Sequence, residues 1–156
     1  MVSPPDPLAV SIFELIGKEP PAPEVVNRTF DLFLHALNNK IAQVHRVKNL
    51  YYPGTVKEWT LIGYSADRIK LPLWGLQMTD RIYINHNADK EGAIRILIHE
   101  LLHFLFEFAD HQKEEKAVTE IERRLWRRFS HAQIEILWQY VPRKVTLTIV
   151  DHEPKK

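Results

Sequence analysis

Apolar side chains recur at three- and four-residue steps in the segment that follows Pro23. This spacing collects them on one face of an α-helix, so it predicts an amphipathic helix from Pro23 to about Ile41. The positions that form the apolar face are Val26, Phe30, Phe33, Leu34, Leu37 and Ile41.

The spacing changes in the middle of the chain, where β-branched and aromatic residues become frequent. Segments 56–65 and 68–74 are rich in them, which predicts short strands. Polar and apolar residues alternate from Asp80 to Asn85, as they do in a half-buried strand. A run of β-branched residues at 145–150 predicts one more strand near the end of the chain.

Three helices are expected between the last two of these strands. The first, from about Lys90 to Phe108, is apolar almost all round and should be buried, with Asn87 or Asp89 as its N-cap. The second runs from about Gln112 to Phe129, and Ser130 caps the third. The order of one helix, several strands and then helices predicts an α+β fold rather than a doubly wound sheet.

The chain length limits the number of domains. With 156 residues, the chain has room for one ordinary domain. Two proline clusters mark residues 1–23 as an extended N-terminal arm, because proline fixes the backbone and removes hydrogen-bond donors. Residues 24–156 are therefore expected to form a single domain.

Charge and cysteine content exclude several classes of function. The net charge is +1, which argues against nucleic-acid binding, although Arg123, Arg124, Arg127 and Arg128 form a local basic patch. The chain begins without a basic segment followed by an apolar run and has no stretch long enough to cross a membrane, so a cytoplasmic location is expected. Because cysteine is absent, a metal ion would have to be held by histidine and carboxylate side chains.

The most informative stretch is His99-Glu100-Leu101-Leu102-His103. Two histidines four residues apart project from the same face of a helix and can bind one zinc ion. Glu100 lies beside the first histidine, where it can act as general base on a water molecule that the metal activates. Alternatively, the three residues belong to an ordinary polar stripe. This alternative is weaker because the motif falls on the most apolar helix of the chain, where such groups are costly.

A catalytic zinc site needs a third protein ligand. The residue six positions after His103 is Ala109, so the ligand has to come from the next helix. At about 100° per residue, Glu114 lies closest to the centre of the apolar face of that helix, which makes it the expected ligand. The alternatives are Glu115, Glu122 and His111.

This combination of motif and following glutamate helix resembles small gluzincin-type metallopeptidases, in particular the minigluzincins and the ImmA/IrrE-like peptidases. The resemblance implies a zincin-like α+β fold with a leading helix, a small and mostly antiparallel twisted sheet, the motif helix and the glutamate helix. It further implies one Zn²⁺ per chain, bound by His99, His103 and Glu114, with Glu100 as general base.

The expected function is zinc-dependent hydrolysis of peptide bonds in a peptide or protein substrate. The alternative is a non-catalytic or latent protein of the same fold that binds a peptide or protein partner or acts as a regulator. Strand 80–85 is expected either to pair with an extended substrate or to lie inside the sheet. The candidate donors to the developing oxyanion are His131, Tyr83 and Tyr140.

Overall fold

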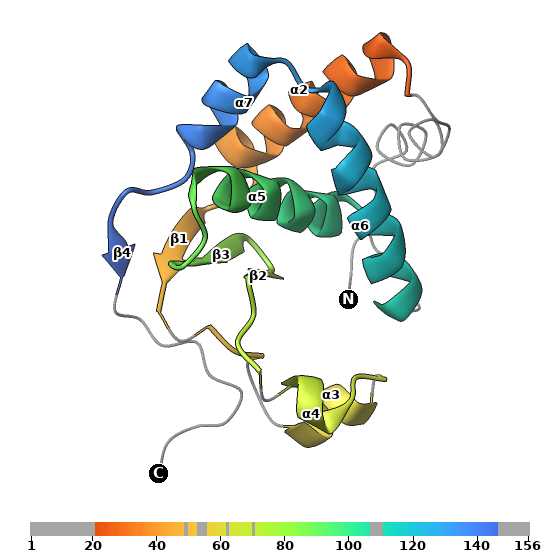
Figure 1. Ribbon diagram of the computed structural model, residues 1–156, viewed down its shortest axis with the longest axis vertical. Coiled ribbons are helices and arrows are strands. Elements are labelled where there is room, and N and C mark those ends of the chain that lie inside the picture. The colour runs from red at the N-terminus through yellow and green to blue at the C-terminus, as the bar shows by residue number, and fades with distance from the viewer. Residues whose placement is uncertain are drawn as a thin grey trace.

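The computed structural model describes residues 21–48, 50–52, 56–61, 63–69, 71–106 and 111–146. The described part of the chain is a mixed α+β structure (Figure 1), as the sequence predicts. The expected arm lies outside the described residues except for 21–23, and so does the expected strand after residue 146. The elements are α2 (Pro23–Asn39), β1 (Gln43–Val47), α3 (Val56–Leu61), α4 (Ala66–Ile69), β2 (Gly75–Met78), β3 (Arg81–Asn85), α5 (Lys90–Leu105), α6 (His111–Arg128), α7 (His131–Trp138) and β4 (Val145–Thr146).

The four strands form one mixed sheet in the order β2-β3-β1-β4. β1 runs parallel to both β3 and β4, and only β2 and β3 are antiparallel. The prediction of a mostly antiparallel sheet is therefore wrong. The chain returns from β1 to β3 through α3, α4 and β2, and such a crossover brings two strands side by side in the same direction.

The predicted strand 80–85 is confirmed as β3, and it lies inside the sheet between β2 and β1. Of its two expected roles, the interior one is correct, because neighbouring strands occupy both of its edges. β2 forms the outer edge on this side of the sheet, and none of the described strands pairs with that edge.

The predictions of strands at 56–65 and 68–74 are wrong, because the described residues there form α3, the end of α4 and irregular segments. Their aromatic side chains pack in a local cluster of Tyr52, Trp59 and Tyr64, with ring centroids 4.7–5.5 Å apart, instead of on a sheet face. The sequence pattern also missed β1 and β2, because the adjacent polar residues His45 and Arg46 interrupt the alternation in β1 and β2 has only four residues.

The four long helical predictions are confirmed as α2, α5, α6 and α7. Asp89 is the N-cap of α5, where its side chain accepts a hydrogen bond from the backbone N–H of Gly92 at 2.7 Å. Ser130 and Gln133 form a capping box at the start of α7. None of the helices in the described ranges combines the length and apolar character that crossing a lipid bilayer would require.

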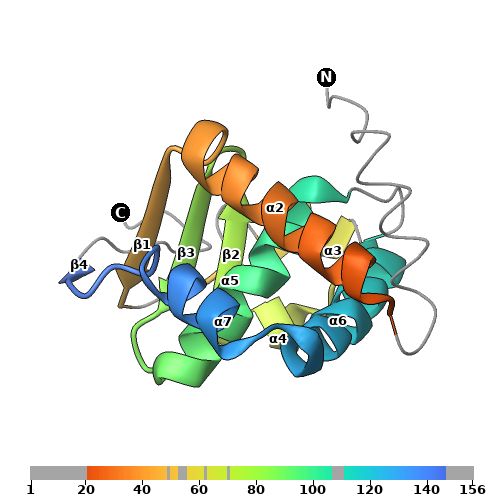
Figure 2. The same ribbon diagram turned by 90° about the horizontal axis from the view of Figure 1, so that it is seen from above.

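α5 is the central element of the structure. It packs against β2 and β3 of the sheet and is covered by α6, α7 and α2, as Figures 1 and 2 show from two directions. The main core gathers fully buried side chains from these elements, among them Phe33, Ile82, Ile84, Leu97 and Leu101. Because both motif histidines belong to α5, this packing fixes where their side chains lie.

β2 lies unusually close to α5 at Gly75. A Cβ atom on this residue would lie 2.4 Å from Cγ2 of Ile96 and 3.0 Å from Oε2 of Glu100. Only glycine fits between the strand and the helix without a displacement. The close approach brings the free edge of the sheet directly beside Glu100.

Gly75→Ala is expected to destabilise the protein by about 1–3 kcal/mol, because the added methyl group overpacks the contact with Ile96. Urea unfolding of the two single variants and the Gly75→Ala/Ile96→Ala double variant measures this effect. The double variant is expected to lose less stability than the two single variants together, since Ile96→Ala removes the clashing atom. A Gly75→Ala variant as stable as the wild type would contradict the account.

Candidate metal centre

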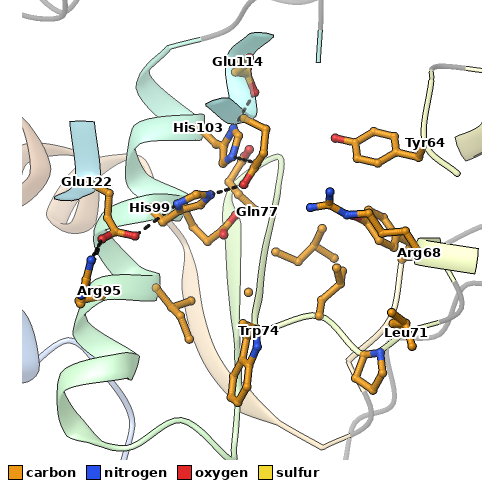
Figure 3. Close-up of a pocket in the computed structure, with 18 of the residues that line it drawn as sticks. Tyr64, Arg68, Leu71, Trp74, Gln77, Arg95, His99, His103, Glu114 and Glu122 are labelled. Carbon is orange, nitrogen blue, oxygen red and sulfur yellow. Dashed lines mark hydrogen bonds and ion pairs between the residues drawn. The ribbon is translucent and has the colours of Figure 1, made fainter. Parts of the chain in front are cut away.

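The two histidines of the motif lie one helical turn apart on the side of α5 that faces α6. Their ring centroids are 4.9 Å apart, and the side chains of His99 and His103 are 16% and 14% exposed. The rings are thus largely shielded but still reach a cleft (Figure 3). This is the arrangement that a helical spacing of four residues predicts.

The carboxylate of Glu115 on α6 joins the two histidines. Its Oε1 lies 2.8 Å from Nε2 of His99, and its Oε2 lies 2.7 Å from Nε2 of His103. One nitrogen from each histidine and one oxygen from Glu115 all lie within 4.8 Å of one another. Two imidazole nitrogens and a carboxylate oxygen are a donor set that suits zinc.

The other ring nitrogen of each histidine also faces a carboxylate. Glu114 Oε2 lies 2.6 Å from Nδ1 of His103, and Glu122 Oε1 lies 3.6 Å from Nδ1 of His99. Arg95 holds Glu122 through two N–H donors, at 2.9 and 2.7 Å from Oε2. Carboxylates in this position orient metal-binding imidazoles and fix their tautomer.

The structure therefore separates the glutamates that the sequence analysis considered as ligands. Glu114 is buried, 8% exposed, as its place on the apolar face predicts, but it contacts Nδ1 of His103 and not Nε2. Glu122 faces Nδ1 of His99. Only Glu115 reaches the Nε2 atoms. The side chain of the remaining alternative, His111, lies outside the described residues.

The cluster is electrostatically coupled. Burial lowers the pKa of both imidazoles, but their carboxylate partners outweigh this effect and raise the pKa of His99 to about 10 and that of His103 to about 9. Burial works against ionised Glu115 as well, yet its hydrogen bonds with His103 and His99 hold its pKa well below the usual range. The negative charge of the glutamates can be neutralised either by protons on the two histidines or by one divalent cation. Zinc binding would therefore release the protons from the histidines.

Glu100 lies between the histidines and the free edge of the sheet. It is 7% exposed and accepts a hydrogen bond from the backbone N–H of Gln77 in β2. Burial raises the pKa of Glu100 to about 6, although His99 and His103 favour its charged form. The carboxylate contributes to the same cleft as the two histidines.

This cleft has a volume of about 820 Å³ and is bounded by three parts of the chain. One wall carries the histidines and glutamates of α5 and α6, and β2 forms the floor. The opposite wall comes from the α3–α4 region, where Tyr64 and Arg68 point across the cleft toward the histidines (Figure 3).

The three expected oxyanion donors do not line this cleft. Tyr83 is buried in β3 and stacks on His45, and the hydroxyl of Tyr140 donates to Asn38 at 2.7 Å. His131 is the first residue of α7. Tyr64 and Arg68 instead line the cleft and face the histidines from the opposite wall (Figure 3). They form no local motif with the histidines, so the sequence contained no signal for them.

The arginine patch of α6 lies apart from the cleft lining. Glu120 accepts hydrogen bonds from Arg123 and Arg124, which offsets part of the positive charge. Arg127 and Arg128 are exposed near the end of the helix. These contacts are typical of a solvated helix face.

A comparison with known protein families, with curated proteins and with solved structures found no match to this chain. The resemblance to small gluzincins therefore stays a prediction. Any assignment of function has to be argued from the geometry of the cleft itself.

Proposed function

We propose that the protein is a zinc-dependent peptidase, with His99, His103 and Glu115 as zinc ligands and Glu100 as general base. The observation that carries this proposal is the single carboxylate of Glu115 held between the Nε2 atoms of both histidines. Glu100 lies in the same cleft but is not hydrogen-bonded to either ring in the described contacts. It therefore remains available for proton transfer.

In this proposal Glu115 takes the ligand role that the sequence analysis assigned to Glu114. Glu114 is hydrogen-bonded to Nδ1 of His103, and Glu122 lies near Nδ1 of His99. Both Nε2 atoms are therefore turned toward Glu115, where they would hold the ion. Zinc bound by this set would polarise the scissile carbonyl and make a water molecule acidic enough to attack it.

The residues of the chain supply the remaining parts of the reaction. Glu100, held beside the ligands by burial and by the N–H of Gln77, accepts the proton of the attacking water and passes it to the leaving amine. Tyr64 faces the cluster from the opposite wall (Figure 3). Burial, together with nearby Tyr52 and Glu115, raises its pKa to about 12, so its hydroxyl stays protonated and can donate to the developing oxyanion.

The free edge of β2 provides a place for an extended peptide. Among the described strands β2 pairs with β3 alone, and its residues Leu76 and Gln77 line the cleft. Main-chain hydrogen bonds along such an edge bind peptides with little dependence on sequence. Because the N–H of Gln77 already reaches Glu100, a peptide would pair with the other outward-facing main-chain groups of β2, and it would run past the general base.

Apolar side chains at the mouth of the cleft favour a peptide as substrate. Trp74 and Leu71 line the cleft and are 62% and 60% exposed. Large apolar groups at a cleft rim are typical of surfaces that bind other molecules. We infer that they receive apolar side chains of the substrate.

The first prediction concerns the third ligand. The purified protein is expected to bind one zinc ion per chain, and Glu115→Ala should weaken zinc binding by more than about 100-fold, because it removes a ligand. Glu114→Ala should weaken it by about 10- to 100-fold through loss of orientation of His103. Competition with a chromogenic chelator measures both affinities.

Glu120→Ala is the matched control for this series, because Glu120 lies on the same helix and pairs with Arg123 and Arg124. Its zinc affinity should equal that of the wild type. A wild-type protein that takes up no zinc, or equal effects of Glu115→Ala and Glu120→Ala, would contradict the assignment.

The second prediction concerns the general base. Glu100→Gln should reduce cleavage of an unfolded protein by about 100-fold or more while the zinc content stays at one per chain. A chelator should stop cleavage by the wild type. Cleavage that persists in Glu100→Gln would refute the base assignment, and a zinc-loaded wild type without any cleavage would favour the non-catalytic alternative.

The third prediction concerns Tyr64. Removing its hydroxyl in Tyr64→Phe should lower kcat by about 100-fold and change KM little, because the hydrogen bond forms only as the oxyanion develops. Tyr140→Phe is the control, since its hydroxyl binds Asn38 outside the cleft. Equal kcat values for the two variants would exclude the role.

A further inference from the structure

Arg68 is a cationic side chain on the wall of the cleft opposite the histidines (Figure 3), where none of the described lining residues is acidic. It lies on α4 and reaches across the cleft toward the histidine wall (Figure 3). That wall carries the carboxylates of Glu100, Glu114, Glu115 and Glu122. Arg68 takes part in none of the ion pairs found among the described residues.

The guanidinium group of Arg68 is held by one hydrogen bond, and most of its N–H donors remain available to a ligand. It is hydrogen-bonded to the side chain of Tyr52, and a guanidinium carries five N–H donors. Tyr52 is 6% exposed and packs edge-on against Trp59, with ring centroids 4.7 Å apart. Tyr52, which is itself packed against Trp59 and Tyr64, thus helps to hold the guanidinium group in place. This reduces the entropy that is lost when a ligand binds.

We propose that Arg68 binds a carboxylate group of the substrate on the wall opposite the metal ligands. The proposal rests on the peptidase function above and names a feature of its substrates. The cationic groups of α5 already have acidic partners, since Arg95 binds Glu122 and both histidines contact Glu115. Arg68 has no acidic partner among the described residues, and its planar N–H fork fits a carboxylate bidentately. The substrate would thus be oriented with its anionic group toward α4 and its peptide bond toward Glu100.

The carboxylate has two chemical sources in a peptide, the C-terminal group and an acidic side chain. The first would direct cleavage to the end of a chain, and the second would select acidic residues within it. Both offer the same pair of oxygens to Arg68, so the experiment has to separate them.

If Arg68 acted only as a positive charge, the result would be different. Lysine supplies the same charge, so Arg68→Lys would then bind peptides as the wild type does. Bidentate binding instead requires the guanidinium itself, so Arg68→Lys should lose most of the preference for a carboxylate.

The test measures peptide binding without turnover, on the zinc-loaded Glu100→Gln protein. The probes are short fluorescent peptides of alanine and leucine in two matched sets. One set ends in a free carboxylate or in an amide, and the other is amidated and carries Glu or Gln at each position in turn. Fluorescence anisotropy gives the dissociation constants.

One of the two sets is expected to bind about tenfold more tightly in its carboxylate form, and the identity of that set names the source of the carboxylate. Arg68→Ala and Arg68→Lys, each combined with Glu100→Gln, should reduce the preference to about onefold to threefold. Lys57→Ala is the matched control, because it removes a charge from α3 outside the cleft and should leave the preference unchanged.

The inference is overturned if no peptide binds, if neither set prefers the carboxylate, or if the preference survives in Arg68→Ala. This failure differs from failure of the proposed function. A wild-type protein that binds zinc and cleaves amidated neutral peptides as well as acidic ones keeps the peptidase assignment and loses only the role of Arg68.

Discussion

The site depends on one interaction, the contact of the Glu115 carboxylate with the Nε2 atoms of both His99 and His103. It requires α5 and α6 to lie at a fixed distance and rotation, because a displacement of about 1 Å would break one of the two contacts. Val118, Ile121 and Leu125 bury the apolar face of α6 against the core and so maintain this geometry. The packing of the core therefore determines the chemistry of the cleft.

On its other side, α5 is constrained by the sheet. Gly75 allows β2 to approach α5, and this approach brings the N–H of Gln77 to Glu100. The proposed general base Glu100 and the two histidines thus lie within about two turns of α5, beside the outer edge of β2 and opposite Glu115 of α6. If the proposed function is correct, this one buried helix organises both the chemistry and the binding of the substrate.

Local signals explain what the sequence predicted and what it missed. The helices and the caps at Asp89 and Ser130 follow from nearby residues, and the motif spacing brings His99 and His103 together. The burial of Glu114 was also predictable from helix geometry, but which glutamate meets Nε2 depends on how far α6 is shifted along α5. The parallel pairing in the sheet and the wall containing Arg68 depend on contacts between distant segments, which local patterns do not contain.

The most direct test is a crystal structure of the zinc-loaded full chain, with the ion located by its anomalous scattering. The account predicts one zinc ion at about 2.0–2.2 Å from Nε2 of His99, Nε2 of His103 and a carboxylate oxygen of Glu115. Glu114 should remain on Nδ1 of His103. Zinc bound by Glu114 in place of Glu115, or bound away from the two histidines, would contradict it.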